Sequence, residues 1–188
     1  MESTLKNMVL TLLVITLVAS AAIGGIYSLT KSAIELSKTA KVNEAIKEVL
    51  PSFDNDPSSE VTTEEIDGEQ VNVYPAKNGG NLIGYAIETF SHNGFSGDIR
   101  LMVGILADGT INSISVLQQN ETPGLGDKIE RSKSDFSLQF DGKNPETFKL
   151  AVTRDGGEVN AITASTVSSR AFTEAVDRAY RLFKTLQN

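Results

Sequence analysis

The feature that most constrains this chain is an uncharged, mostly apolar segment from Asn7 to Thr30. Residues 8–27 are long enough to cross a hydrocarbon core of about 30 Å as a helix, and Tyr27 falls where interfacial aromatic residues lie. We therefore predict a transmembrane helix at about residues 8–27, within an N-terminal segment of residues 1–30, in contact with membrane lipid.

A cleaved signal peptide is the alternative, because Ala19-Ser20-Ala21 has the small-x-small form of a cleavage site. Retention as an anchor is the better prediction, since Glu2 offsets Lys6 before the run and the apolar run continues beyond the small residues. Charge does not decide the orientation. Lysines follow the span as well as precede it, and a long C-terminal domain can cross a membrane regardless of them.

Residues 31–70 predict a stalk helix followed by an acidic linker. Val42, Ile46 and Val49 recur at helical spacing, and Pro51 ends the run. Residues 52–70 are rich in Asp and Glu and poor in large apolar side chains, which is typical of a solvated linker with one short element at most.

From Val71 onward the pattern changes to short strands separated by glycine turns, and residues 71–188 predict one α+β domain. The predicted strands are residues 82–90, 98–106 and 111–117. The last two form a hairpin, because Gly109 in the turn between them can adopt a positive φ.

Two further elements are predicted toward the C-terminus. Residues 148–153 and 159–162 flank a glycine pair and predict a second hairpin. Residues 167–186 predict a helix, because their apolar side chains recur every three or four positions.

Composition excludes several kinds of site. The chain has no cysteine and one histidine, so disulfides, thiolate metal sites and multi-histidine metal sites are excluded. A net charge of −7 argues against a general nucleic-acid binder. His92 lies in a predicted turn near Gly97, where a structural or exposed role is expected. No pair of carboxylates has a spacing that indicates acid–base work, so we expect neither a catalytic residue nor a metal.

Two loops are places where a ligand can approach the backbone. Residues 121–128 (ETPGLGDK) combine a rigid proline with two glycines. Residues 163–169 (TASTVSS) lead into the final helix, whose first N–H groups and partial positive charge favour a phosphate. On composition alone, an ordinary strand-to-helix turn and a helix N-cap are the favoured explanations of these two loops.

In sequence order, these segments resemble a known family. The strand at residues 97–105, the turn at 108–111, the ETPGLG loop at 121–126 and the TASTVS loop at 163–168 are similar to an FMN-binding domain. That domain is shared by the G subunit of the Rnf electron-transport complex and the C subunit of the sodium-pumping NADH:quinone oxidoreductase. The resemblance covers about residues 70–180, and the ETPGLGDKIE segment is closer to the Rnf G subunit.

The resemblance implies that FMN is bound covalently by a phosphoester to Thr166, the last threonine of the family's motif Ser/Thr-Gly-Ala-Thr-x-Ser/Thr. A flavin transferase would install it from FAD. The ETPGLG loop would then hold the isoalloxazine ring. The implied cofactor-binding residues are Thr163, Ala164, Ser165, Thr166, Glu121, Thr122, Gly124, Leu125, Gly126 and Lys128.

The implied function is that of an electron-carrying subunit in an Rnf-type translocase. Such a complex couples electron transfer between ferredoxin and NAD⁺ to ion translocation. Its other membrane and redox subunits would be the partners of this chain, and no stand-alone activity is expected. The resemblance also implies that the flavin domain lies on the extracytoplasmic side of the cell membrane.

This chain departs from the family motif at two positions. Ala164 replaces the usual glycine, which would strain the loop if φ there is positive. Ser165 replaces the usual alanine and is a rival acceptor, with Thr166 preferred. Two alternatives therefore stay open: a flavin-free structural subunit, and an anchored extracellular binding module whose hydroxyl loop only caps a helix.

Overall fold

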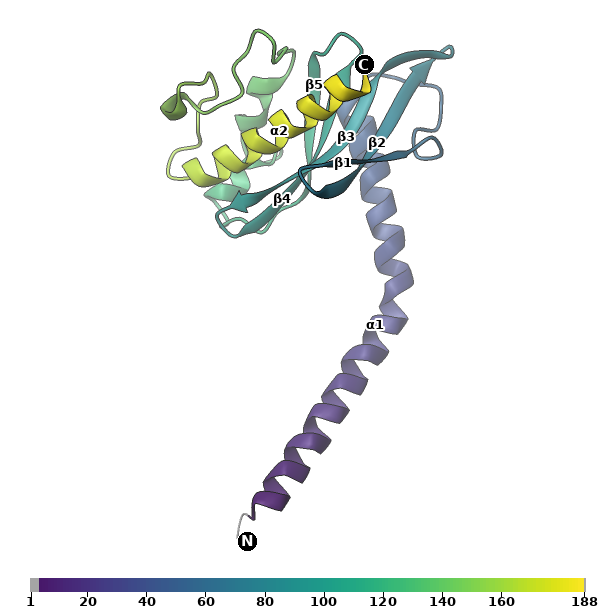
Figure 1. Ribbon diagram of the computed structural model, residues 1–188, viewed down its shortest axis with the longest axis vertical. Coiled ribbons are helices and arrows are strands. Elements are labelled where there is room, and N and C mark those ends of the chain that lie inside the picture. The colour runs from purple at the N-terminus through teal and green to yellow at the C-terminus, as the bar shows by residue number, and fades with distance from the viewer. Residues whose placement is uncertain (1–3, 188) are drawn as a thin grey trace. The chain divides into compact units, whose positions relative to one another are not determined.

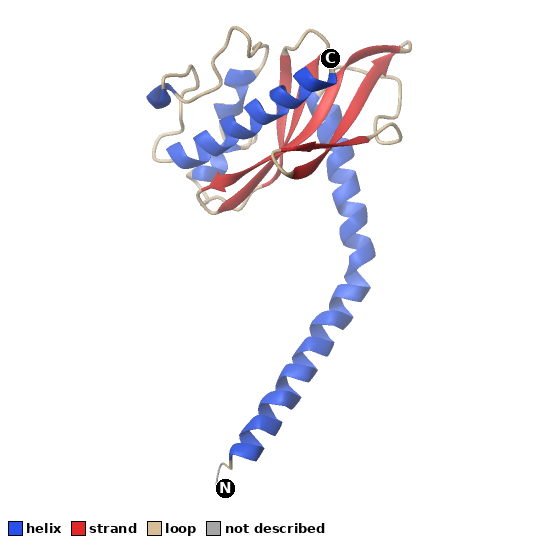
Figure 2. Cartoon of the chain, viewed as in Figure 1, coloured by secondary structure: helices blue, strands red, loops and turns tan. Residues whose placement is uncertain are grey.

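The computed structural model describes residues 4–187 of the chain. Figure 2 shows long helices at both ends of the chain and strands between them. The elements, in chain order, are α1 (Leu5–Val49), β1 (Thr62–Ile66), β2 (Glu69–Asn78), β3 (Asn81–Gly94), β4 (Gly97–Leu106), β5 (Ile111–Gln118), the 3₁₀ helices η1 (Gly126–Ile129), η2 (Phe136–Phe140) and η3 (Thr153–Asp155), and α2 (Thr166–Leu186). The predicted α+β class is confirmed. The chain divides into two compact units between Ala40 and Lys41.

The first unit consists of the greater part of α1, whose apolar side chains are exposed along the predicted span. Its most apolar stretch has a mean hydropathy of 2.4, and none of that stretch is buried within the protein. A helix that is apolar on all sides needs an apolar environment to cover it. The predicted span and stalk are one continuous helix, long and apolar enough to cross a membrane, although a signal sequence shares these properties.

The second unit is built on a five-stranded antiparallel sheet in the order β1-β2-β3-β4-β5. Each strand pairs with the next in the sequence, so the sheet is a meander of hairpins. The predicted hairpin at residues 98–106 and 111–117 is confirmed by β4 and β5, with Met102 opposite Ser115. Gly109 in its turn has a φ of 85°.

The two faces of the sheet are both buried, against different helices. On β4, Ile99, Leu101, Val103 and Ile105 belong to the core on the α2 side, whereas Met102 belongs to a second core. This alternation follows from the two-residue period of a strand. Figure 1 shows α2 lying across one face of the sheet. The predicted C-terminal helix is confirmed by α2.

The last turns of α1 form the second core. Ala45, Ile46 and Val49 are buried with Met102 on the opposite sheet face. The carbonyl of Val49 lies directly against Gly104, where a Cβ atom would have no room. The end of α1 is therefore part of the compact domain.

The acidic segment differs from the predicted linker of residues 52–70, because part of it joins the sheet. Strand β1 pairs with β2 through a turn at Asp67 and Gly68, which have φ values of 51° and 85°. An Asp-Gly pair with positive φ at both positions is a favoured two-residue hairpin turn. Ile66 packs against the core and accounts for the strand despite the acidic composition. The sheet thus begins at Thr62, before the predicted domain start at residue 71.

The predicted second hairpin is wrong. Residues 148–162 hold only an isolated parallel bridge between Val152 and Val159, with η3 between them. Both valines are buried, and Phe148, Leu150, Ala161 and Ile162 pack against the same core while partly exposed. Gly157 lies against the backbone of Ala151, where a Cβ atom has no room. This tight return of the chain replaces an extended ladder.

Candidate functional site

A pocket of about 320 Å³ lies where three separate segments of the chain meet. They are the β3–β4 turn, the loop after β5 and the start of α2. This volume is at the lower end of the range for small-molecule sites, roughly 300–1,000 Å³. The lining residues are Phe95, Glu121, Thr122, Leu125, Gly126, Ala164, Ser165, Thr166, Val167 and Ser168. The two loops singled out in the sequence therefore form one pocket.

Three of the predicted site residues do not line this pocket. Thr163 is exposed in the turn before α2, and Gly124 is exposed with a φ of 76°. Lys128 lies in η1, where its carbonyl accepts a hydrogen bond from the Ser134 hydroxyl at 2.5 Å. Gly124 and Lys128 shape the loop that contributes Thr122, Leu125 and Gly126.

Sequence reasoning missed Phe95, Val167 and Ser168 as lining residues. Phe95 lies in a two-residue turn between Gly94 and Gly97, with 70% of its surface exposed. A large apolar side chain in so short a turn between two glycines could have indicated a ligand contact. Val167 and Ser168 lie inside the hydroxyl motif and follow Thr166 directly.

Glu121 is buried at the centre of the site, with 4% of its surface exposed. Its Oε1 accepts a hydrogen bond from the Ser96 N–H at 2.9 Å, and its Oε2 accepts one from the Ser168 hydroxyl. The Glu121 N–H donates to Gln119 Oε1 at 2.5 Å. Within residues 4–187, Glu121 has no Lys or Arg partner, so neutral donors alone satisfy this carboxylate.

Gly126 is required beside this carboxylate. A Cβ atom at that position would lie 2.6 Å from Glu121 Oε2 and 2.6 Å from Ser168 Oγ. Both distances are too short for real contacts. The second glycine of ETPGLG therefore lets the loop backbone pack directly against the pair formed by Glu121 and Ser168.

The hydroxyl loop turns sharply at Ala164, which has a φ of 62°. A left-handed conformation costs an alanine about 1–2 kcal/mol. The strain expected for alanine at this position is therefore present. Ser165 is buried, with 7% of its surface exposed, whereas Thr166 is half-buried at the pocket wall.

The start of α2 presents free backbone donors to the pocket. The Ser165 side chain makes no capping hydrogen bond, and the first bond of the helix is from the Ser169 N–H to the Ser165 carbonyl at 3.0 Å. Within the described part of the chain, the N–H groups of Thr166, Val167 and Ser168 have no acceptor. Such groups, with the helix dipole, bind phosphate well.

The lining has an apolar side and a polar side. Phe95, Leu125 and Val167 are large apolar residues with at least two-fifths of their surface exposed. The hydroxyls and the uncapped helix start supply the polar groups. This combination fits a ligand with an apolar ring and a phosphate, and FMN has both.

His92 lies outside this pocket, and its predicted turn is wrong because it belongs to β3. Its Nδ1 is 2.9 Å from Asp98 and its Nε2 is 2.9 Å from Glu69, on the two neighbouring strands. The hydrogen bond with Asp98, followed by the charges of both carboxylates, raises the pKa of His92. Half of the side chain is exposed, so a structural role on the surface of the sheet is indicated.

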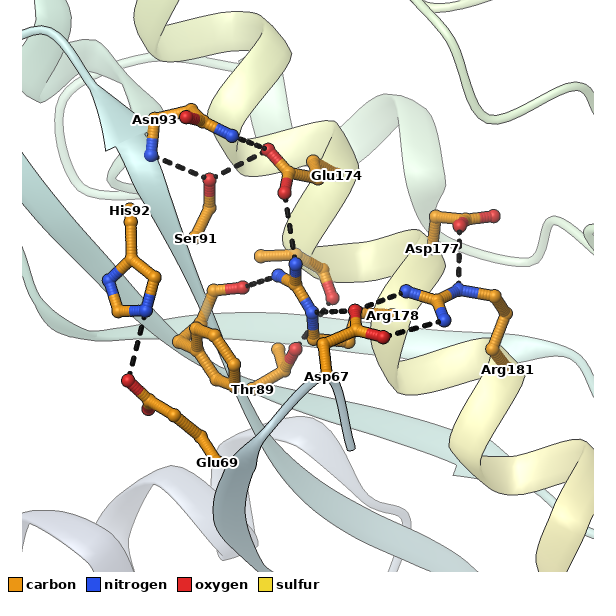
Figure 3. A network of polar contacts seen from close by, with 12 residues as sticks. Asp67, Glu69, Thr89, Ser91, His92, Asn93, Glu174, Asp177, Arg178 and Arg181 are labelled. Atoms are coloured by element: carbon orange, nitrogen blue, oxygen red, sulfur yellow. Dashed lines mark hydrogen bonds and ion pairs between the residues drawn. The ribbon is translucent and has the colours of Figure 1, made fainter. Parts of the chain in front are cut away.

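A second polar network joins the sheet to α2 (Figure 3). Arg178 contacts Asp67 at 2.7 Å and Glu174 at 3.0 Å, and it donates to the carbonyl of Phe90. Arg181 also pairs with Asp67, at 2.7 Å. The hydrogen bonds from Arg181 and Arg178 hold the pKa of Asp67 well below its usual value.

No cluster of three or more His, Asp or Glu side chains in residues 4–187 could hold a metal ion. The comparisons with known proteins concern the pocket formed by the two loops.

The model of the FMN-binding domain family matches residues 94–181, a range that contains every residue lining the pocket. The G subunit of an ion-translocating oxidoreductase complex from Haemophilus influenzae is 35% identical over 88% of this chain and 83% of its own length. The G subunit of the Na⁺-translocating ferredoxin:NAD⁺ oxidoreductase complex of Acetobacterium woodii is 34% identical over 94% of this chain and 90% of its own. The corresponding G subunit from Aliivibrio fischeri is 32% identical over all of this chain and 94% of its own.

These relatives match 88–100% of the chain, and the family model covers the pocket built from both loops. The chain therefore belongs to the family of Rnf-type ion-translocating oxidoreductase complex G subunits, and residues 94–181 are its FMN-binding domain.

Proposed function

We propose that this chain is a membrane-anchored electron carrier that holds FMN through a phosphoester to Thr166. The observation that carries the proposal is the meeting of the ETPGLG loop and the hydroxyl loop in one pocket at the uncapped start of α2. Neither loop alone makes a ligand site. Together they supply an attachment hydroxyl, phosphate donors and an apolar wall.

Thr166 is the hydroxyl best suited to the attachment. It lines the pocket and is half-buried, and its side-chain hydroxyl makes no hydrogen bond within the described residues. Ser165 lines the same pocket but is nearly buried. Ser168 is engaged with Glu121, and Ser169 with the Ser165 carbonyl. These contacts favour Thr166 over the other hydroxyls of the loop.

When bound, FMN supplies the reversible uptake of electrons. The residues of this chain hold it in place. The N–H groups at the start of α2 stabilise the phosphate charge, Phe95, Leu125 and Val167 offer apolar contact to the ring, and Gly126 keeps the loop close to the helix. No acid or base is needed for electron transfer alone.

The wider setting follows from the relatives. The Acetobacterium woodii protein is named for a Na⁺-translocating ferredoxin:NAD⁺ oxidoreductase complex. We propose that this chain works in a complex of that type, between ferredoxin and NAD⁺, with the other membrane and redox subunits as partners. Its flavin domain lies on the extracytoplasmic side of the cell membrane and is anchored by the apolar segment at about residues 8–27, and a flavin transferase installs the FMN.

The test is the intact mass of the full chain co-expressed with a flavin transferase, beside Thr166→Val and Ser165→Ala variants. We expect a gain of one FMN unit that survives denaturation in the wild type and in Ser165→Ala, and no gain in Thr166→Val. Loss of the gain only in Ser165→Ala would move the bond to the neighbouring serine. No gain in any chain, with an active transferase, would refute the covalent carrier.

One observation favours the alternative of a flavin-free structural subunit. The φ of 62° at Ala164 strains the loop that presents Thr166. A chain that had lost the modification would tolerate such a change. An Ala164→Gly variant that gains FMN while the wild type does not would support this alternative.

A further inference from the structure

We propose that Glu121 is a positioning residue that fixes the three walls of the pocket relative to one another. The effect of Glu121 on FMN attachment rests on the function proposed above, whereas its role in holding the walls together rests on its hydrogen bonds alone. Glu121 is the one pocket residue whose side chain bonds both to the β3–β4 turn and to α2 within the described chain.

The three walls come from distant parts of the sequence. Ser96 lies in the β3–β4 turn, Glu121 lies in the loop after β5, and Ser168 lies in the first turn of α2. The contacts of Glu121 span 25 residues to Ser96 and 47 residues to Ser168. A single carboxylate therefore ties segments that share no strand ladder at this point.

The carboxylate has little freedom to move. A Cβ atom at Gly94 would lie 2.9 Å from Glu121 Oε1, and one at Gly126 would lie 2.6 Å from Oε2. Backbone thus packs against both oxygens. A buried carboxylate with only neutral donors is costly to keep, and shorter polar side chains would not reach both donors. The arrangement indicates that the position of this group matters.

The contacts of Glu121 set the position of two residues that matter for the flavin. Phe95 adjoins Ser96 and is 70% exposed, so its own packing holds it weakly. Thr166 lies two residues before Ser168 on the same helical turn. Through Glu121, the apolar wall at Phe95 and the attachment hydroxyl are held at a fixed spacing.

The structural part is tested by hydrogen exchange, read by mass spectrometry on the full chain before FMN attachment. In the wild type the Ser96 N–H is protected by Glu121. In Glu121→Ala we expect exchange of the 94–97 turn to rise about tenfold or more, the effect of losing one hydrogen bond to a charged group. Glu121→Gln should keep most of the protection, because its amide can accept from Ser96 and donate to Ser168.

The consequence for the flavin is tested by the rate of FMN attachment with a flavin transferase and FAD. We expect about a tenfold loss or more in Glu121→Ala, near wild-type rates in Glu121→Gln, and an intermediate loss in Ser168→Ala. Rescue by glutamine separates positioning from the negative charge itself.

Asp67→Ala is the matched control, because Asp67 also ties distant segments and, among residues 4–187, its carboxylate pairs with Arg178 and Arg181 rather than with the pocket. It should lower the melting temperature without changing exchange at residues 94–97 or the attachment rate. The proposal would be overturned if Glu121→Ala kept the wild-type hydrogen exchange at residues 94–97 and the wild-type rate of FMN attachment. It would also be overturned if Asp67→Ala, at the same melting temperature as Glu121→Ala, lost as much exchange protection and attachment rate. If wild type acquires no FMN, the proposed function is wrong, and the exchange result alone decides whether Glu121 holds the turn.

Discussion

The carbonyl of Val49, in the last turn of α1, lies directly against Gly104 in the middle of β4. Asn112 on β5 donates a hydrogen bond to the same carbonyl at 2.8 Å. A helix end leaves carbonyls without intrahelical partners, and here the sheet supplies one. Helix α1 therefore ends inside the folded domain, through a backbone contact that only a glycine permits.

Gly104→Ala should lower the free energy of unfolding of the domain by about 1–3 kcal/mol, the usual cost of overpacking a filled core. Thr62→Ala, on the exposed edge strand, is the control and should change it by less than about 0.5 kcal/mol. Chemical denaturation of the full chain in detergent micelles measures both. Equal free energies of unfolding for the two variants would show that the end of α1 does not pack against Gly104.

Ala164→Gly should stabilise the domain by roughly 0.5–1 kcal/mol. It removes a left-handed alanine, worth about 1–2 kcal/mol, and part of that gain is offset by the greater freedom of glycine in the unfolded chain, about 0.4–1 kcal/mol. Ala161→Gly, three residues earlier and without a positive φ, should destabilise instead. Thermal unfolding of the two variants gives opposite signs if the strain at residue 164 is real.

The stability should fall as pH rises through the pKa of His92. The hydrogen bond with Asp98 and the nearby Glu69 raise this pKa above its ordinary value of 6.5 in the folded state. Its contribution is therefore complete below pH 6.5 and is lost as pH rises through the higher folded value. Because the side chain is half exposed, the effect should be small and weaken with salt.

His92→Gln is the variant that isolates this contribution, since the glutamine amide can still donate to a carboxylate but does not titrate. Denaturation curves from pH 5.5 to 8.5 should show a steeper decline in the wild type than in the variant. Parallel curves would mean that His92 is not protonated more readily in the folded state.

Asp67 should give the opposite pH dependence. Its pKa is lowered by hydrogen bonds from Arg181 and Arg178, so its contribution is present above its ordinary value near 3.8 and is lost as pH falls below it. Asp67→Asn keeps a residue that tolerates the φ of 51° and replaces the titratable carboxylate with a neutral amide that has one acceptor oxygen. Unfolding between pH 5 and 2.5 should be less acid-sensitive in this variant, and an unchanged acid limb would contradict the role of the network.

The elements that sequence patterns predicted well are those with strong periodicity. Apolar residues alternate along β4 and β5 and recur every three or four positions in α2. In all three elements this pattern places apolar side chains in the same core, so tertiary packing favours the same secondary structure as the local sequence. The two loops of the site were also visible, because glycine, proline and hydroxyl residues are concentrated there.

The elements that were missed depend on contacts distant in sequence. Strand β1 is held by pairing with β2 and by the partly buried side chain of Ile66, a single apolar residue in an acidic stretch. The runs around Val152 and Val159 have strand-like sequences, but they pair only through the bridge between these two valines. A tight return of the chain at Gly157 lies between them and prevents an extended ladder. Phe95 enters the site from a turn whose Ser96 N–H donates to Glu121, 25 residues later in the sequence.

The most direct measurement is tandem mass spectrometry of the tryptic peptide at residues 155–170, taken from the chain co-expressed with a flavin transferase. This peptide carries every hydroxyl of the loop, from Thr163 to Ser169. If FMN is attached as proposed, the peptide carries one FMN phosphoester, which the fragment ions locate on Thr166. An unmodified peptide, or FMN located on any other residue, would contradict that account.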